Sequence, residues 1–159
     1  MTVLVLLALL GRRDALRAAG TYERVYLDPR RNLHAVSTSG QDVTLTSWGR
    51  YFDPKHSTDG KTIGVLVLSR VRIHPREDAE LAHELLIYRD RRVVRRIQAD
   101  GWVRAWGFWN GGQQVAIYGG GLHFAGIYVL YDLSTGDVRG TSQDPVSDAS
   151  PAWVRALVP

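Results

Sequence analysis

Short apolar-rich runs alternate with turn signals along most of this chain, and the clearest series lies between Trp102 and Thr141. Four runs rich in aromatic and β-branched residues occur there, separated by an Asn-Gly-Gly sequence, further glycines and a Ser-Thr-Gly sequence. Runs of this kind, bounded by Gly, Asn and Ser, are typical of strands joined by turns. We therefore predict a four-stranded antiparallel meander over residues 102–109, 114–118, 127–132 and 137–141.

The preceding part of the chain has the same pattern in a less regular form. Strand-like runs occur at residues 22–27, 33–37, 43–48, 63–73, 84–88 and 93–98. An Asp-Pro pair and a Ser-Thr-Asp-Gly-Lys sequence predict a loop over residues 51–61 that ends in a tight turn. Residues 74–82 predict a polar insertion, with a short helix over residues 76–85 as an alternative. Residues 152–158 predict a terminal strand.

Residues 2–10 are apolar throughout, and two interpretations of them are open. A secretory signal has a basic stretch before its apolar core, which this segment lacks, whereas a continuous apolar run bounded by glycine fits a buried strand. We favour the strand. A signal would place the protein in the periplasm or outside the cell, and a structural strand would leave it cytoplasmic. No run reaches the roughly 18 to 20 apolar residues that span a bilayer, so we expect no membrane span.

Two aromatic residues recur at a similar spacing in three parts of the chain. A tyrosine near the end of the first strand of each predicted hairpin is followed by a tryptophan. The pairs Tyr26–Trp48, Tyr88–Trp106 and Tyr131–Trp153 are 22, 18 and 22 residues apart. Such self-similarity indicates repeated structural units, and we expect these aromatic side chains to pack in the core or between units. The predicted units are residues 1–40 with 152–158, 41–98, and 99–151.

The order of the predicted strands resembles the strand-swapped closure of β-propellers, in which both ends of the chain build the first blade. The turns at residues 57–61 and 131–137 look similar to those of WD40-like and TolB-like propeller repeats. The resemblance implies an all-β fold of antiparallel four-stranded meanders, arranged as a three-bladed partial β-propeller. The alternative fold is a small β-sandwich or open barrel with a short N-terminal helix.

Three blades are fewer than the roughly four to eight that close a propeller ring. Open strand edges must be paired or covered. The resemblance therefore implies a partner, either a second copy that completes a six-bladed homodimer or the remainder of a longer propeller.

Composition narrows the class of protein without naming its function. The chain has 159 residues, 45% of them hydrophobic, which favours one folded domain over a disordered chain. Of its 20 basic side chains only Lys55 and Lys61 are lysines, and a net charge of +4 is too mild to predict nucleic-acid binding. Because cysteine is absent, disulfides, thiolate metal sites and a cysteine nucleophile are excluded.

Two polar segments contain the residues best suited to chemistry. His74, Glu77 and His83 form the densest group of side chains that can bind a metal, and His56 and Asp59 lie in the other segment. Neither spacing matches an established metal site, and no Gly-x-Ser-x-Gly sequence predicts a serine hydrolase. We therefore expect no metal, no cofactor and no catalytic residue, and treat these five residues as candidates for binding.

Arginines form two further patterns. Arg70 and Arg72 alternate with apolar residues, which predicts one solvated face at the end of the 63–73 strand. Arg92 and Arg96 share one face of an arginine-rich hairpin that contains a single acidic residue. Such a hairpin can bind phosphate or an acidic protein surface, but we favour the interpretation that its charges deter edge-to-edge pairing.

Two functions remain open from the sequence. The first is a non-catalytic binding module that holds a protein or peptide through loops on one rim, chiefly residues 51–61 and 74–82. The second is an enzyme or small-ligand binder in the channel of an assembled ring. Converging histidines and carboxylates would favour the second, and without them we expect the first.

Overall fold

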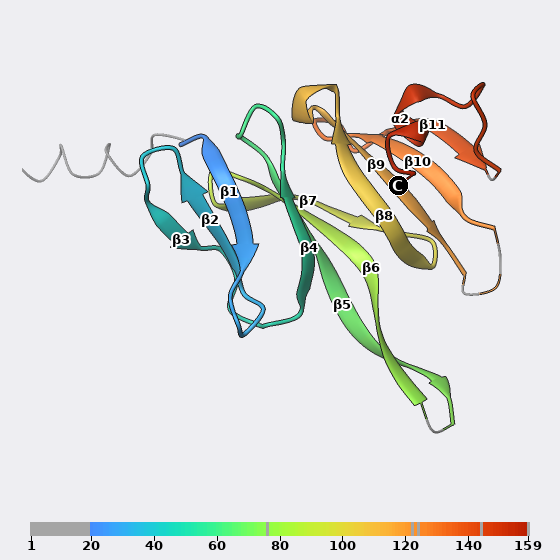
Figure 1. Ribbon diagram of the computed structural model, residues 1–159, viewed down its shortest axis with the longest axis horizontal. Helices are drawn as coiled ribbons and strands as arrows, with labels where there is room; N and C mark the ends of the chain where they lie inside the picture. The colour runs from blue at the N-terminus through green and yellow to red at the C-terminus, as the bar shows by residue number, and fades with distance from the viewer. Residues whose placement is uncertain (1–19, 76, 122, 124, 144, 159) are drawn as a thin grey trace, which may run out of the picture.

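The computed structural model describes residues 20–75, 77–121, 123, 125–143 and 145–158. Within these residues three antiparallel sheets follow one another along the chain (Figure 1), so the predicted all-β fold is confirmed. The first sheet contains β1 (Tyr22–Leu27), β2 (Leu33–Ser37) and β3 (Asp42–Thr44). The second contains β4 (Tyr51–His56), β5 (Ile63–His74), β6 (Glu77–Arg89) and β7 (Arg92–Gln98). The third contains β8 (Trp102–Trp109), β9 (Gln114–Gly120), β10 (Ile127–Asp132) and β11 (Val138–Gln143).

Local turn chemistry explains the hairpins that the sequence predicted. In the β10–β11 turn, Asp132 Oδ1 accepts hydrogen bonds from the backbone N–H groups of Ser134 and Thr135. A hydrogen bond from the Ser134 hydroxyl is the main cause of the lowered pKa of Asp132, and the two backbone bonds lower it further. In the β6–β7 turn, Asp90 and Arg91 both have positive φ, at 49° and 64°, as a tight hairpin turn requires. The predicted meander of the third sheet is confirmed.

Two apolar layers hold the three sheets together. Between the first and second sheets, side chains including Leu33, Ala35 and Val65 are fully buried. Between the second and third sheets, Trp106 of β8 is 1% exposed and packs with residues such as Leu85 and Ile117. Both faces of the second sheet are therefore covered, which explains the nearly continuous apolar sequence at the start of β5.

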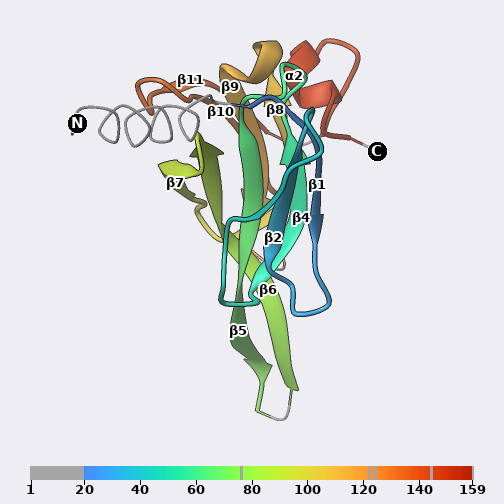
Figure 2. The ribbon, with the colours of Figure 1, turned by 90° about the vertical axis from the view of Figure 1, so that its left-hand side faces the viewer.

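The first strand of each sheet, β1, β4 or β8, lies toward the same side of the molecule. In Figure 2, β1 and β4 lie to the right, and β7 and β11 lie to the left. Hydrogen bonds join the leading edges. Lys55 Nζ of β4 donates to the Trp106 carbonyl oxygen of β8 over 2.6 Å. The Tyr22 N–H at the start of β1 donates to the Gly60 carbonyl oxygen over 2.7 Å.

The C-terminal segment forms a short helix, α2 (Ala152–Arg155), so the predicted strand over residues 152–158 is wrong. The segment covers the face of the third sheet that points away from the second sheet. Small residues leave room for it, since a Cβ added at Gly107 would lie 3.3 Å from Leu157, and one added at Gly140 would lie 3.3 Å from Trp153. Val154, on the inner side of α2, is fully buried. The sequence pattern of residues 152–158 did not show that the third sheet is already complete. Its four strands all precede residue 152, so the C-terminal segment packs on the face of the sheet instead of joining its edge.

Two other predicted elements of the second sheet are also wrong. Residues 51–56 form the edge strand β4 instead of a loop, because the Asp-Pro pair makes a bulge between Phe52 and Lys55. The polar insertion and the alternative helix are replaced by a continuous β5–β6 hairpin. Glu and Ala favour helix locally, but pairing with the strongly β-forming β5 outweighs that preference.

The structure also changes the start of the second predicted unit. β3 pairs with β2, so residues 42–44 belong to the first sheet. Trp48 is 81% exposed and contributes to neither layer, so its predicted packing role is wrong. The predicted strand over residues 2–10 lies outside the described residues. No helix in the described part of the chain is long and apolar enough to cross a membrane.

Candidate functional site

A two-stranded extension of the second sheet is the most prominent surface feature. β5 and β6 have 12 and 13 residues, whereas β4 and β7 have 6 and 7. Leu68 and Ala82 pair at the base of the extension and are buried. Beyond them the two strands leave the body of the sheets and project as an arm, which we define as residues 69–74 and 77–81 (Figures 1 and 2).

Strand alternation gives the arm one charged and one mostly apolar face. The cross-strand pairs on the charged face are Arg70–Glu80 and Arg72–Asp78, and those on the other face are Ser69–Leu81 and Val71–Ala79. Ile73 continues the apolar face and is 39% exposed. A two-stranded hairpin has no core of its own. The arm therefore leaves apolar side chains and strand edges available at the surface.

Ion pairs on the charged face are unevenly shared. Arg70 Nε lies 3.0 Å from Asp78 Oδ2, and Arg72 Nε lies 3.4 Å from Asp78 Oδ1. The side chains of Arg70 and Arg72 remain 78% and 73% exposed. Glu80 instead pairs with Arg31 of the β1–β2 turn over 2.7 Å. Two guanidinium groups thus share one carboxylate, which leaves an excess positive charge along β5.

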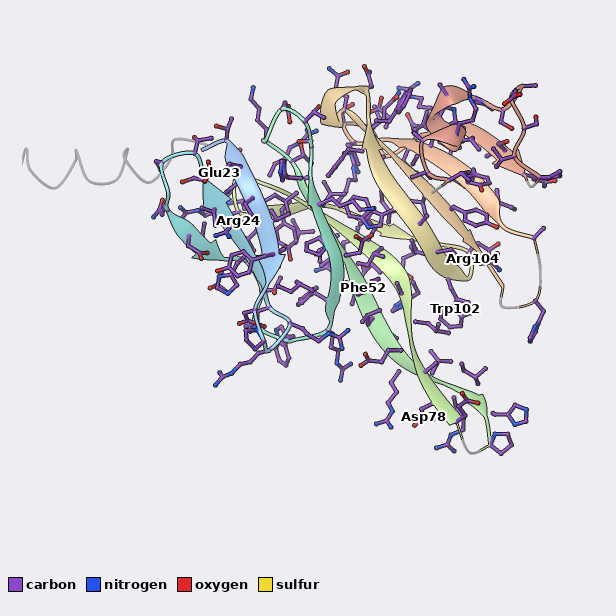
Figure 3. The ribbon with its side chains drawn as sticks, in the orientation of Figure 1. Glu23, Arg24, Phe52, Asp78, Trp102 and Arg104 are labelled. Carbon is purple, nitrogen blue, oxygen red and sulfur yellow. The ribbon has the colours of Figure 1, made fainter. Side chains whose placement is uncertain are left out.

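The predicted rim loops lie at opposite ends of the second sheet. His56 and Asp59 are at the β4–β5 turn, whereas His74 and Glu77 are at the tip of the arm. β5 runs between the two ends and has 12 residues, so they are about 40 Å apart at roughly 3.3 Å per residue. In Figure 3, Asp78 marks the far part of the arm, well away from the other labelled residues. The two loops cannot form one binding rim.

At the β4–β5 turn, Asp59 has a structural role. Its Oδ1 accepts hydrogen bonds from the Ser57 hydroxyl over 2.5 Å and from the Lys61 N–H over 3.0 Å. The Ser57 hydrogen bond is the main cause of the lowered pKa of Asp59. His56 Nδ1 donates to the Ser57 carbonyl oxygen over 2.9 Å. Both side chains are used within the turn itself.

A shallow depression of about 420 Å³ lies between β1 and β4. Its lining residues are Glu23, Arg24, Val25, Pro54, Lys55 and His56. His56 is the one predicted binding residue among them. Lys55 is held by an ion pair with Asp53 over 3.1 Å and by its bond to Trp106. The depression is open, and among the described residues no hydrogen bond or ion pair joins His56 to Glu23, the carboxylate in the same lining.

The remaining histidine and carboxylate candidates do not converge. His74 and Glu77 pair across the arm tip and are exposed. His83 directly follows Ala82 at the base of the arm, and its buried Nδ1 has no hydrogen-bond partner among the described residues. The described part of the chain contains no group of three or more histidine and carboxylate side chains placed to hold a metal ion.

Most arginines of the β6–β7 hairpin hold neighbouring segments in place. Arg95 donates to the carbonyl oxygens of Leu133 and Ser134, over 3.2 and 2.5 Å, and so joins the second sheet to the third. Arg96 Nη1 pairs with Glu84 Oε1 on the adjacent strand over 3.4 Å. Arg92 is exposed at the start of β7. The two predicted binding arginines therefore do not form a shared anion site with the rest of the hairpin.

A polar network on the outer face of the first sheet was not expected. Tyr26 donates its hydroxyl hydrogen to Asp42 Oδ2 over 2.5 Å, and His34 Nδ1 lies 3.0 Å from Asp42 Oδ1. The Tyr26 hydrogen bond is the main cause of the lowered pKa of Asp42. The Tyr26 and His34 rings stack with centroids 5.0 Å apart. These residues come from three strands, so only the sheet register brings them together.

The arm residues were also missed as a site, although the sequence carried part of the signal. The alternation of Arg70 and Arg72 with apolar residues correctly predicted a solvated face. The alternation did not indicate that β4 pairs with β5 only as far as Val67, which leaves Arg70 and Arg72 on an open strand edge.

Comparisons with known proteins do not assign this chain to a family. No family model matches it, and neither the curated proteins nor the solved structures contain a significant match. The functional argument therefore rests on the geometry of the chain itself.

Proposed function

We propose that the protein is a non-catalytic, propeller-like binding module that holds a protein or peptide partner on the arm. The observation that carries the proposal is the projection of β5 and β6 beyond the strands that flank them. The arm combines exposed apolar side chains, exposed guanidinium groups on β5 and open strand edges. Recognition of extended peptides commonly uses these three features.

The dispersed candidate residues support binding rather than catalysis. An acid–base or nucleophilic mechanism needs its groups within hydrogen-bonding reach of one reacting centre. His56 and Asp59 are about 40 Å from His74 and Glu77, by the rise of the 12-residue β5 strand. The alternative of an enzyme in a central channel therefore gains no support from these residues.

Shortening the arm is expected to abolish partner binding while leaving the fold intact. In the test variant, Asn-Gly replaces residues 70–80 and joins the paired residues Ser69 and Leu81. We expect its unfolding free energy to stay within about 1 kcal/mol of the wild-type value, because the removed residues lie outside both apolar layers. Peptides selected from a random display library on the wild-type protein should bind the shortened variant at least about tenfold more weakly.

Equal binding to both proteins, or selection that enriches no peptide, would contradict the proposal. If the shortened chain fails to fold, the double variant Val71→Ser/Ile73→Ser tests the same surface. Those two side chains are at the surface of the arm, so their replacement leaves both apolar layers in place.

The outer faces of the first and third sheets are unsuited to the interface that a six-bladed homodimer would need. Ring closure would place the outer face of the third sheet of one copy against the first sheet of the other. α2 covers that face of the third sheet, and the Tyr26–Asp42–His34 network makes the opposing face polar. We therefore expect light scattering to give a mass near 17.8 kDa. A stable mass of twice that value would instead support the ring.

A further inference from the structure

The β4–β5 ladder ends where the arm begins. Its last cross-strand pair is Tyr51–Val67, and the Leu68 N–H then donates to the Arg50 carbonyl oxygen over 2.8 Å. Beyond Leu68, β5 is paired only with β6 among the described strands. The edge of β5 is therefore open in direct line with β4.

Alternation along the strand identifies the backbone groups on this edge. The bond from Leu68 to Arg50 shows that the N–H of Leu68 points toward β4. Backbone groups two residues apart point to the same side of a strand. The N–H and C=O groups of Arg70 and Arg72 therefore point to the open edge, whereas those of Ser69 and Val71 point toward β6. An added strand would find two donors and two acceptors in line.

The side chains distinguish this edge from the other edge of the arm. On β5, the residues with open backbone groups carry the guanidinium groups of Arg70 and Arg72, which share only Asp78. By the same alternation, the open backbone groups of β6 belong to Asp78 and Glu80, so its edge is acidic. Opposite charges across neighbouring strands stabilise pairing, and like charges destabilise it. An added strand with acidic side chains is therefore expected to pair with the open edge of β5 rather than with that of β6.

We propose that an extended segment of a partner protein, with alternating acidic and apolar residues, adds to the open edge of β5 at Arg70 and Arg72. Its acidic side chains lie beside the two guanidinium groups. Its apolar side chains lie on the opposite face, beside Val71 and Ile73. This inference rests on the proposed function, and it names the edge and the class of partner.

A second copy of the chain fits this edge less well. Pairing of β5 with β5 of another copy would place arginines beside arginines. Pairing of β5 with β6 of another copy joins two different surfaces, and such contacts tend to form open chains rather than closed dimers. An acidic segment of a different protein can pair with the backbone groups of this edge without placing arginines side by side and without forming open chains of copies.

The test uses a labelled eight-residue peptide of alternating glutamate and valine, with a lysine–valine peptide as its control. We expect fluorescence anisotropy to show saturable binding of the acidic peptide alone. At a peptide concentration about 100 times the Kd, amide exchange at Arg70 and Arg72 should slow up to about 100-fold. Exchange at Ser69 and Val71 should change little, because their amides already bond to β6, and it also reports that the arm remains folded.

Matched variants separate charge from backbone. Arg70→Gln/Arg72→Gln should weaken the acidic peptide about tenfold, whereas Arg92→Gln on the β6–β7 hairpin should leave binding unchanged. Arg70→Pro removes the same charge as Arg70→Gln and, in addition, the N–H at the open edge. It should therefore bind more weakly than Arg70→Gln.

Equal binding of both peptides, protection at Asp78 and Glu80 instead of Arg70 and Arg72, or an equal loss with Arg92→Gln would overturn the inference. Slowed exchange at Arg70 and Arg72 in concentrated protein without peptide would overturn it in favour of a second copy. Slowed amide exchange at Asp78 and Glu80 would still be consistent with the proposed function, because these residues also belong to the arm. Equal binding of the acidic peptide to the arm-shortened variant contradicts the proposed function as well.

Discussion

Replacing Gly64 with alanine is expected to lower the unfolding free energy by about 2 to 3 kcal/mol. Alanine ordinarily stabilises a strand relative to glycine, so the expected change has the opposite sign to the usual one. The reason is that a Cβ at this position would lie 2.4 Å from Cη2 and 2.7 Å from Cζ3 of Trp106. Trp106 is 1% exposed and lies within the apolar layer between the second and third sheets, so its ring cannot turn into solvent to relieve the clash. Urea unfolding followed by tryptophan fluorescence measures the effect.

Gly20→Ala serves as the matched control, because the nearest atom to its added Cβ is Ser37 Cβ at 3.5 Å, an ordinary contact. We expect its unfolding free energy to remain within about 0.5 kcal/mol of wild type. Combining Gly64→Ala with Trp106→Phe should cost less than the sum of the single changes, since the clashing ring atoms are removed. Simple additivity would show that Gly64 and Trp106 are not in contact.

Val154→Asp is expected to release α2 from the third sheet and to destabilise the protein by about 3 kcal/mol or more. Val154 is fully buried, so a carboxylate at this position would lose its hydration. The charge is accommodated only if the helix leaves, which exposes Trp153 and Leu157 together with the sheet beneath. Thermal unfolding, dye binding to exposed apolar surface and a red shift of the tryptophan emission measure the release.

Arg155→Ala on the same helix is the control, because Arg155 is exposed. Its melting temperature should differ little from that of the wild type. If Val154→Asp and Arg155→Ala had equal and small effects, α2 would not contribute to the stability of the third sheet.

The role of α2 explains how an open stack of sheets can remain folded. In repeat architectures, terminal units need a cover or a polar outer face. Here α2 covers the third sheet, and the Tyr26–Asp42–His34 network makes the outer face of the first sheet polar. The two ends use different solutions, and neither leaves a broad apolar face in the described part of the chain. This is why the proposed interaction surface is the arm rather than either outer face.

The site illustrates the limit of adjacency along a sequence. The propeller-like interpretation placed residues 51–61 and 74–82 on one rim, and the β-rich run over residues 63–73 lies between them. That run is a single extended strand of 12 residues, and an extended strand separates its ends as far as a chain of that length allows. A helix of the same length would span less than half that distance.

The sequence by itself determined the all-β class, the hairpin turns and the meander of the third sheet, because strand periodicity and turn chemistry act over a few neighbouring residues. It also indicated the solvated face that carries Arg70 and Arg72. Only the tertiary structure decided that residues 152–158 form a cover rather than a strand, that residues 77–82 extend β6, and that β5 has an open edge. Each of these depends on which distant segment occupies a face or an edge, and packing between segments outweighs local preference there.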